Sequence, residues 1–348
     1  MVERLRIGVL GASGYTGADL VRLAACHPGV EIALLTADTH AGKSLGEVFP
    51  HLARLHHLPP LVKWQDADWS AVDVIFCGLP HGTTQEVVAT LPTDKVVIDL
   101  SADFRLRDPA TYAEWYGHEH RAKELQSEAV YGLTEFYRAE IAGARLIACP
   151  GCYPTAALLA LVPIVTDRLV DSGQLIIDAK SGVSGAGRGV RQNSLFCEAG
   201  EGLRPYSIAS HRHAPEIEQE LALVAGCEVL VNFTPHLVPM SRGELVTIHV
   251  ALAPDVQPED LIDALARTYA DEPFVHVLEN GGVPGTQDVR GSNDCLIAVF
   301  ADRIPNRAIV VATIDNLVKG SSGQALQNMN VRFALAETTG LEQLALFP

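Results

Sequence analysis

The sequence contains no long hydrophobic run. Its longest uninterrupted apolar stretch covers ten residues, Ala156 to Val165, and includes Pro163, whereas a membrane-spanning helix needs about 20 apolar residues. The N-terminal residues MVERLRIGVLG carry charge at once and lack the basic and then apolar pattern of a secretory signal. We therefore expect no membrane partner and a cytoplasmic location.

Positive charge is also scarce. The formal net charge is −16 at pH 7, so the basic surface that nucleic-acid binding needs is not expected. Nucleic acid is therefore excluded as a predicted partner. If the ligand is an anion, its site must be locally positive and built from individual Arg and Lys side chains and helix N-termini.

The seven cysteines are odd in number and scattered along the chain. Disulfide frameworks are typical of short exported chains with an even number of cysteines, so we expect reduced thiols. A structural zinc site needs a second Cys or His pair at short spacing, and none follows the C-x-x-C of Cys149 and Cys152. We expect no bound metal.

The sequence does contain strand and helix patterns in two arrangements. Its 348 residues suggest about two domains. Before residue 150, strand patterns alternate with helical ones, which indicates βαβ units and a parallel sheet. The strand patterns cover 5–10, 31–37, 72–79 and 95–100, and the helical ones 18–26 and 83–91.

Beyond residue 150, several strand patterns follow one another through turns. They cover 174–180, 229–234, 245–252, 295–300 and 308–314. This arrangement indicates a second, α+β domain with a more antiparallel sheet. The tail from Gly320 has a helical pattern, with Ser321 or Ser322 as its cap.

A glycine-rich turn, Gly11-Ala-Ser-Gly14-Tyr-Thr-Gly17, follows the first strand and opens the first helix. Small residues let the backbone approach a pyrophosphate, and the helix N-terminus supplies N–H groups. The spacing differs from the commoner G-x-G-x-x-G, and a tight turn without a ligand is the alternative. In this context we interpret it as a dinucleotide site formed by Gly11, Ser13, Gly14, Tyr15, Thr16 and Gly17.

The choice between NAD and NADP stays open on these residues. Asp38 lies about 20 residues after the last glycine, where an acid pairs with a ribose hydroxyl and favours NAD. Thr36, Thr39, Lys43 and Ser44 lie nearby and could hold a 2′-phosphate instead.

Cys152 is the candidate nucleophile. Cys149 ends the strand pattern RLIAC, while Cys152 lies on the following turn, at the start of a helix that Pro154 favours. A helix N-terminus stabilises a thiolate. The alternatives are a redox dithiol with Cys149 and a buried structural thiol.

Two histidines offer proton transfer to such a thiol. His211 and His213 flank Arg212 just before a helical pattern, and an imidazole that titrates near neutrality suits acid–base work. Which of the two points inward stays open, and His236 is a weaker candidate. A lone histidine is more often a surface or core residue.

Three further segments follow strands and carry groups suited to ligands. The loop from Lys180 to Arg188 is rich in Gly and Ser, so it could present N–H groups to an anion, with Arg188 as a clamp; a flexible surface loop is the alternative. Ser101-Ala-Asp103-Phe-Arg105 and Leu79-Pro80-His81-Gly82 each end a strand, at the edge where α/β proteins bind ligands.

Taken together, these motifs resemble the N-acetyl-γ-glutamyl-phosphate reductases of arginine biosynthesis, which share their fold with aspartate-semialdehyde dehydrogenases. The resemblance covers essentially the whole chain and is most specific around Cys152. It rests on GASGYTG at 11–17, LPHG at 79–82, DLSADFR at 99–105, CPGCYPTAALLAL at 149–161, SGVSGAGR at 181–188, SHRHAPEI at 210–217 and IDNLVKG at 314–320.

The resemblance implies an α/β fold with a Rossmann-type NADP-binding domain, residues 1–150 completed by a C-terminal helix at 320–348. Residues 151–319 would form an α+β catalytic and dimerisation domain with a mixed, largely antiparallel sheet. It implies self-association as a homodimer or homotetramer and NADP(H) as the cofactor, with which Asp38 fits poorly. The implied cofactor residues beyond the glycine-rich turn are Thr36, Lys43, Pro80, Ser181, Gly182, Gly185 and Asn316.

The resemblance also implies a reaction. The Cys152 thiolate would attack the acyl phosphate, a thioester would form, and NADPH would reduce it to the semialdehyde. His211, with His213 as second choice, would handle protons. Arg105, Arg188 and Lys319 would bind the anionic substrate.

Two other functions compete with this one. A reductase of the same fold could act on a carrier-linked aminoadipyl phosphate of a lysine pathway, but no dense basic run for an acidic carrier is visible. A non-catalytic NADP-binding sensor would need neither Cys152 nor the histidines. An aspartate-semialdehyde dehydrogenase is disfavoured because the region where its catalytic histidine is expected reads PMSRGE at 239–244.

Overall fold

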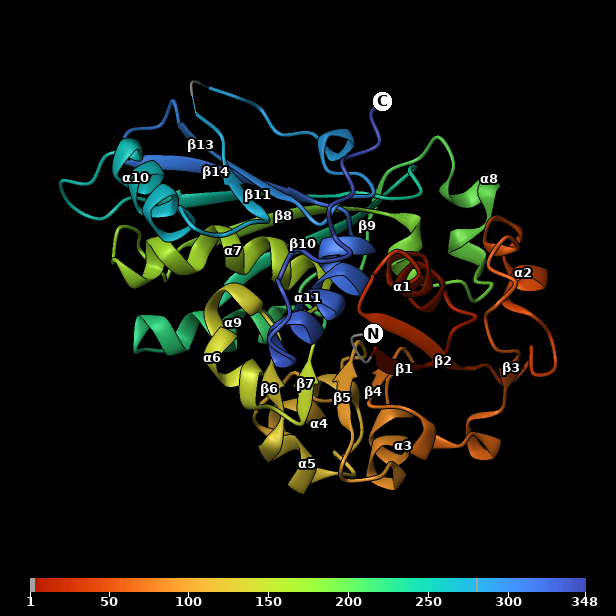
Figure 1. The fold of residues 1–348 in the computed structure, drawn as a ribbon. Coiled ribbons are helices and arrows are strands. Elements are labelled where there is room, and N and C mark those ends of the chain that lie inside the picture. Colours follow the sequence, from red (N-terminus) through yellow and green to blue (C-terminus); the bar gives the residue numbers. More distant parts are fainter. Residues whose placement is uncertain (1–3, 280) are drawn as a thin grey trace. The chain divides into compact units, whose positions relative to one another are not determined.

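The computed structural model describes residues 4–279 and 281–348 (Figure 1). The chain forms two compact units. The first contains the chain up to Pro150 and Ser321–Glu342, and the second contains Gly151–Gly320 and Gln343–Pro348.

The first unit is built on a seven-stranded sheet in the order β3-β2-β1-β4-β5-β7-β6, in which every neighbouring pair is parallel. The chain leaves β1 toward β2 and returns to its other side as β4, so the strand order reverses there. In such sheets, ligands bind beyond the carboxyl ends of the strands at this reversal. The strands are β1 (Leu5–Leu10), β2 (Val30–Thr36), β3 (Leu61–Val62), β4 (Val74–Cys77), β5 (Val96–Asp99), β6 (Val130–Tyr131) and β7 (Leu146–Ala148).

Seven α-helices of the described chain belong to this unit. They are α1 (Tyr15–Ala24), α2 (Leu45–Val48), α3 (Thr84–Thr90), α4 (Pro109–Tyr116), α5 (Lys123–Glu128), α6 (Thr134–Gly143) and α11 (Gly323–Arg332). The last of these packs against α1, α6 and β5. Two of its amides, on Gln324 and Asn328, donate to the Gly132 carbonyl at 3.0 and 2.9 Å.

The C-terminal helix predicted over 320–348 is wrong in its bounds. A π-helical turn covers Val318–Ser322, and α11 ends at Arg332. The last six residues belong to the second unit, because the Arg290 guanidinium donates to the Leu346 carbonyl, and the Leu346 amide donates to the Arg290 carbonyl.

The second unit contains a mixed seven-stranded sheet in the order β12-β13-β14-β11-β8-β10-β9. The β8–β10 and β12–β13 pairs are parallel and the other pairs antiparallel. This confirms the predicted fold class, a parallel α/β unit followed by an α+β unit. The strands are β8 (Leu175–Gly182), β9 (Arg204–Pro205), β10 (Val231–Val238), β11 (Glu244–Ala251), β12 (Val275–Val277), β13 (Cys295–Ala301) and β14 (Arg307–Ile314).

Helix α7 (Cys152–Thr166) lies along one face of this sheet, packed against β11 and β14 (Figure 1). Helices α9 (Ala214–Ala225) and α10 (Pro258–Thr268) pack beside it, and the short α8 covers Phe196–Ala199. Every residue of α7 from Tyr153 to Val165 is buried, as expected of a helix that is apolar on all sides.

A proline interrupts the hydrogen bonding of α7. Pro163 has no N–H, so the carbonyl of Leu159, four residues earlier, loses its helical partner. The Tyr269 hydroxyl donates to that carbonyl instead. The buried polar group is therefore satisfied by a side chain from outside the helix. Among the residues that the structure describes, no helix has the length and hydropathy to cross a membrane.

Candidate active site

Cys152 is the first residue of α7 and is half-buried. Gly151 precedes it as the N-cap, so Cys152 lies where helix amides and the helix dipole favour a negative charge. The Gly151 amide donates to the Glu216 carboxylate at 2.8 Å, and Glu216 on α9 is buried. A side chain at Gly320 would place its Cβ 2.8 Å from the Cys152 Cβ, so only glycine fits against the thiol there.

Both predicted histidines lie beside this turn. His213 is the N-cap of α9, and its ring contacts Gly151 so closely that a Cβ there would lie 2.4 Å from Nε2. The His211 and His213 ring centroids are 4.7 Å apart. His211 also contacts the rings of Tyr153 and Tyr206, with centroid distances of 5.8 and 5.3 Å. The structure thus brings both histidines to the turn that carries Cys152.

The protonation of His211 differs from the sequence prediction. Burial, with a smaller contribution from the Arg212 charge, lowers its pKa to about 4, so the expected titration near neutrality is wrong. The His213 amide donates to Nδ1 at 3.1 Å. A neutral ring whose Nδ1 accepts must carry its proton on Nε2. His211 is therefore a neutral hydrogen-bond donor at pH 7.

His236 has a different environment. Its Nδ1 lies 3.2 Å from the Ala179 carbonyl and 3.1 Å from the Asp178 carboxylate on β8. Its backbone carbonyl accepts from the Tyr153 hydroxyl at 3.2 Å. The ring is thus bound to the neighbouring strand.

Sequence reasoning missed two polar residues near the thiol. The Tyr206 hydroxyl donates to the Tyr153 hydroxyl at 3.4 Å. Glu244, the first residue of β11, is completely buried; burial raises the pKa of its carboxyl group, and an interaction with the Cys152 side chain partly offsets this. The signal for Glu244 was present in the sequence, because it occupies an inward position of a strand whose other inward residues, such as Val246 and Ile248, are apolar.

The glycine- and serine-rich loop lies at the same end of the sheet. Ser181 pairs with Glu244 across β8 and β11, and both Ser181 and Asn316 are buried. The Asn316 side chain accepts from the Gly243 amide at 2.8 Å and donates to the Ser184 hydroxyl at 3.0 Å. It therefore ties the loop to the start of β11 through both ends of its amide group.

The two remaining glycines predicted for the cofactor lie in this loop as well. A Cβ at Gly182 would lie 2.9 Å from the Arg242 amide nitrogen, so a larger residue would push β8 from this turn. A Cβ at Gly185 would lie 3.1 Å from the Ser181 hydroxyl. Both glycines permit a close backbone approach.

In the first unit, the glycine-rich turn has the shape that a pyrophosphate site needs. Gly11 has φ of +79°, and a Cβ there would lie 2.6 Å from the Gly78 carbonyl. A Cβ at Gly17 would lie 2.5 Å from the Gly11 carbonyl oxygen. Gly14 caps α1, so the amides of the next residues, Tyr15 and Thr16 among them, point out of the helix start. Ser13 is half-buried on this turn.

The other cofactor candidates of this unit differ in exposure. Thr36 is buried and its hydroxyl accepts from the Gly11 amide at 3.3 Å, so it shapes the turn. Asp38, Lys43 and Pro80 are exposed. Pro80 lies in a turn that Asp103 holds, because that carboxylate accepts from the Gly82 and Thr84 amides at 2.8 and 3.1 Å.

The three cationic candidates lie in unlike settings. Arg188 is exposed on the loop after β8. Arg105 is buried and donates to the carbonyls of Cys149 and Leu100 at 2.7 and 3.1 Å. Lys319 is completely buried, with its ammonium 5.8 Å from the centre of the Phe274 ring.

Cys149 is a buried thiol of the first unit. Burial raises its pKa to about 12, and the Asn328 amide lies 3.6 Å from its sulfur. A thiol in this state is a poor nucleophile. All seven cysteines, which lie in the described part of the chain, are thiols rather than disulfides.

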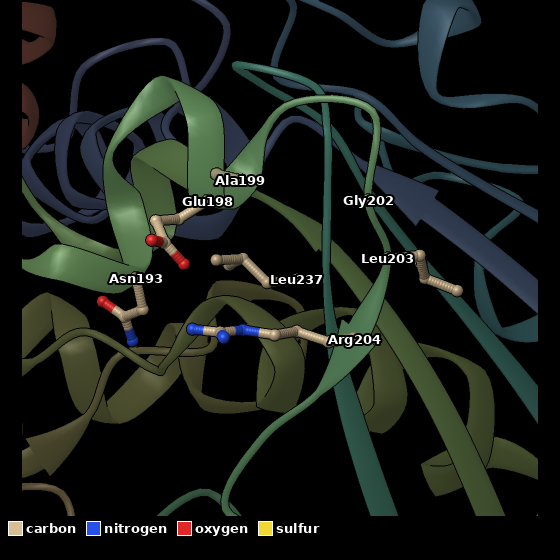
Figure 2. A pocket seen from close by; sticks show the side chains of 7 residues that line it. All are labelled: Asn193, Glu198, Ala199, Gly202, Leu203, Arg204 and Leu237. Atoms are coloured by element: carbon tan, nitrogen blue, oxygen red, sulfur yellow. The ribbon is translucent and has the colours of Figure 1, made fainter.

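A separate pocket lies between β10 and the segment before β9. Figure 2 shows the Asn193, Glu198 and Arg204 side chains around Leu237. Leu237 and Arg204 are paired residues of β10 and β9. The residues that line this pocket are Asn193, Glu198, Ala199, Gly202, Leu203, Arg204 and Leu237. Neither Cys152 nor the two histidines line it, so it is not the predicted site.

Comparisons with known proteins cover nearly the whole chain. Residues 6–144 match the family described as semialdehyde dehydrogenase, NAD binding domain, and residues 152–316 match semialdehyde dehydrogenase, dimerisation domain. A relative from Arabidopsis thaliana, named probable N-acetyl-gamma-glutamyl-phosphate reductase, chloroplastic, is 58% identical over 99% of this chain and 86% of its own length. The N-acetyl-gamma-glutamyl-phosphate reductase of Rhodospirillum rubrum is 54% identical over the full length of both chains.

Solved structures share the fold at low identity. Aspartate semialdehyde dehydrogenase II of Vibrio cholerae, complexed with ASA, aligns with a TM-score of 0.71 at 17% identity, covering 95% of this chain and 99% of the other. The Candida albicans enzyme with NADP aligns with a TM-score of 0.67, also at 17% identity, and covers the same shares of the two chains.

Proposed function

The chain belongs to the N-acetyl-γ-glutamyl-phosphate reductase family, and we propose that it reduces N-acetyl-γ-glutamyl phosphate with NADPH to N-acetyl-L-glutamate 5-semialdehyde and phosphate, in arginine biosynthesis. The resemblance predicted from the motifs is thereby confirmed. The observation that carries the proposal is Cys152 at the first turn of α7, beside His211 and His213.

The position of Cys152 suits covalent catalysis. The sulfur attacks the acyl carbon, the S–C bond forms, and the C–O bond to phosphate breaks with its electron pair leaving on phosphate. The resulting thioester is reduced at the same carbon. The tetrahedral thiohemiacetal then releases the aldehyde and returns the electron pair of the C–S bond to sulfur. This route splits one difficult displacement into easier steps.

The oxyanion that forms in each step needs hydrogen-bond donors. The Cys152 amide, at the start of α7, is one candidate. The Nε2–H of neutral His211 is the other, since its Nδ1 is already accepting from the His213 amide. A neutral imidazole donates this hydrogen bond without first having to be protonated, so His211 can stabilise the oxyanion while keeping its proton.

The residues of the first unit fit a dinucleotide. Because Gly11 and Gly17 carry no side chain, a pyrophosphate can approach the backbone of the turn closely. The start of α1 adds amide donors. Bound NADPH supplies the hydride that reduces the thioester. We assign NADP rather than NAD; the exposed Lys43 would hold the 2′-phosphate, and the exposed Asp38 would have to lie away from it.

Arg188 ranks first for the substrate anion. It is exposed on the loop that Asn316 ties to β11, so its guanidinium can move to a phosphate or carboxylate. Arg105 already donates to two backbone carbonyls, and Lys319 is completely buried. Those two are therefore secondary candidates.

We propose that the protein works as a homodimer in the cytoplasm. Along β11 and β14, buried residues alternate with half-exposed ones, so one face of the sheet is covered and the other open. Thr247, Val311 and Ile309 lie on the open face, together with Ile176, which is 39% exposed. A second copy would cover this largely apolar group of side chains. The exposed thiols Cys26, Cys197 and Cys227 suit a reducing compartment.

The test is the reverse reaction, which avoids the unstable acyl phosphate. N-acetylglutamate semialdehyde, phosphate and NADP are mixed with the protein, and the nicotinamide absorbance is followed. We expect phosphate-dependent reduction of NADP that is lost in Cys152→Ser and retained in Cys149→Ser. Reduction of NAD alone would overturn the NADP assignment. Tight dinucleotide binding without any turnover would favour a sensor or another acyl phosphate.

A further inference from the structure

Asp103 is a buried side chain for which the reaction above has no use. It follows β5 and is completely buried. Both carboxylate oxygens accept from the Gly82 amide, at 2.8 and 2.9 Å, and Oδ2 also accepts from the Thr84 amide at 3.1 Å. The Tyr112 hydroxyl donates to Oδ1 at 2.8 Å. A buried carboxylate costs free energy unless donors surround it, and these three donors meet that need.

The segment that Asp103 binds is a tight turn between β4 and α3. The Thr83 amide donates to the Pro80 carbonyl at 3.2 Å, which closes a four-residue turn. Gly82, its third residue, has φ of +78°, as a type II turn requires at this position. A carboxylate that only capped α3 would bind the amides of the helix. Asp103 instead gives both oxygens to Gly82, which lies two residues before the helix begins.

This turn lies beside the glycine-rich turn of the first unit. The Gly78 amide donates to the Leu10 carbonyl at 2.9 Å, and a Cβ at Gly11 would lie 3.6 Å from the Leu79 side chain. In the sheet, β4 is next to β1 on the side opposite β2. A dinucleotide places its adenine ribose near the end of the second strand, so its nicotinamide half extends over the end of β4. The Pro80–Thr83 turn is therefore on the nicotinamide side.

Asp103 is itself fixed by the residues that follow it. His120 accepts from the Ala122 amide at Nδ1, at 3.2 Å, so its Nε2 carries the proton and donates to the Asp103 carbonyl at 2.7 Å. Tyr112 is completely buried and its ring stacks on Tyr116, with the ring centroids 4.5 Å apart. The backbone and the side chain of Asp103 are thus both held by α4 and the segment after it.

We propose that Asp103 is a positioning residue, which holds the Pro80–Thr83 turn in place for the nicotinamide half of NADPH. It acts through the Gly82 and Thr84 amides, while Pro80 and His81 remain exposed on the turn. A turn that is already ordered binds its ligand at a lower entropic cost. This assignment rests on the proposed function for the identity of the cofactor.

The first test needs no cofactor. The Gly82 amide contacts both oxygens, so in Asp103→Asn the side-chain NH₂ group faces this amide whichever oxygen it replaces. We expect the Gly82 and Thr84 amides to exchange with D₂O about tenfold faster in this variant. Mass spectrometry of the peptide that carries the turn provides the measurement. Unchanged exchange would overturn the proposal.

Asp108→Asn is the matched control. Asp108 is the N-cap of α4 and accepts from the Ala110 and Thr111 amides at 3.0 and 3.2 Å and from the Thr111 hydroxyl at 2.9 Å. The control variant therefore loses the same kinds of hydrogen bond in the same unit, but away from the turn. Its exchange at Gly82 and Thr84 should match the wild type.

The second test compares two ligands. NADPH binding is followed by nicotinamide fluorescence, and calorimetry gives the Kd of adenosine 2′,5′-bisphosphate, which lacks the nicotinamide half. In Asp103→Asn we expect the Kd of NADPH to rise about tenfold, as the loss of one hydrogen bond to a charged group does, and the Kd of the bisphosphate to stay unchanged. Asp108→Asn should change neither value. Equal weakening of both ligands, or of neither, would overturn the proposal.

Tyr112→Phe decides the question if Asp103→Asn does not fold. It removes one donor to the carboxylate and leaves both backbone hydrogen bonds in place, so we expect NADPH to bind about threefold more weakly and the bisphosphate to bind as in the wild type. An unchanged Kd of NADPH in this variant would contradict the role of Asp103. A wild type that binds neither ligand would overturn the proposed cofactor instead, and the exchange rates would still decide whether Asp103 holds the turn.

Discussion

Burial sets the protonation of the two groups beside Cys152, and it acts on them in opposite directions. It lowers the pKa of His211 to about 4 and raises the pKa of Glu244 to about 8, because in both cases the charged form is disfavoured. At neutral pH the His211 imidazole is therefore uncharged, and the Glu244 carboxyl group is mostly protonated.

His211→Ala tests the donor role at this scale. We expect kcat to fall by about 10²-fold or more, since an oxyanion donor is lost, while the dissociation constant for NADPH stays unchanged. Steady-state kinetics of the reverse reaction provide the measurement. His276→Ala, on an exposed histidine paired with Asp294, serves as the control. Near-wild-type activity in His211→Ala would transfer the role to His213.

The candidate catalytic residues could be predicted from the sequence, and the contacts between them could not. The position of Cys152 after a strand and before a helix was sufficient to predict a nucleophile. That His211 is desolvated and that Asn316 spans two loops depend on residues about 60 to 130 positions away along the chain. Glu244 was detectable as an acid at an inward strand position, but its proximity to Cys152 depends on the packing of α7 against β11.

At the scale of elements, α7 shows how a side chain compensates for a helical hydrogen bond that a proline removes. Pro163 removes an amide from the helix interior, and the Tyr269 hydroxyl replaces it at the Leu159 carbonyl. The helix that carries the nucleophile at its first turn thus depends on a side chain that lies far along the chain.

Tyr269→Phe should lower the free energy of unfolding by about 1–3 kcal/mol, because it leaves a buried carbonyl without a donor. Urea unfolding provides the measurement. In a Pro163→Ala background, the backbone regains the missing amide at this position, so the same tyrosine substitution should cost clearly less. Equal losses in both backgrounds would show that the Tyr269 hydroxyl is not compensating for the proline.

The order and type of most elements were predictable, because apolar strand patterns run through β11, β13 and β14. The end of the C-terminal helix was not, since the residues after Arg332 are held by distant partners. Arg138 on α6 pairs with Glu337 at 3.1 Å, and Arg290 binds Leu346. Such long-range partners leave no trace in a local pattern.

At the scale of the whole molecule, the open face of the second sheet makes self-association testable. Val311→Arg would place a charge among the apolar side chains of that face, and burying an unpaired charge is costly. We expect light scattering after size exclusion to give twice the 37.3 kDa monomer mass for the wild type and the monomer mass for the variant. Leu223→Arg, on the exposed side of α9, should leave the mass unchanged. A Val311→Arg variant that keeps the wild-type mass would place the interface elsewhere.

The path of the chain limits how the gene can be divided. The polypeptide passes from one unit to the other after Pro150, again after Gly320 and a third time after Glu342. A fragment that ends at Pro150 would lack α11, whose Asn328 and Gln324 bind Gly132, and would expose the apolar surface that this helix covers. A stop codon after Glu342 would remove the C-terminal segment whose Leu346 carbonyl accepts from the Arg290 guanidinium. Neither unit can therefore be transferred to another protein as one continuous piece of coding sequence.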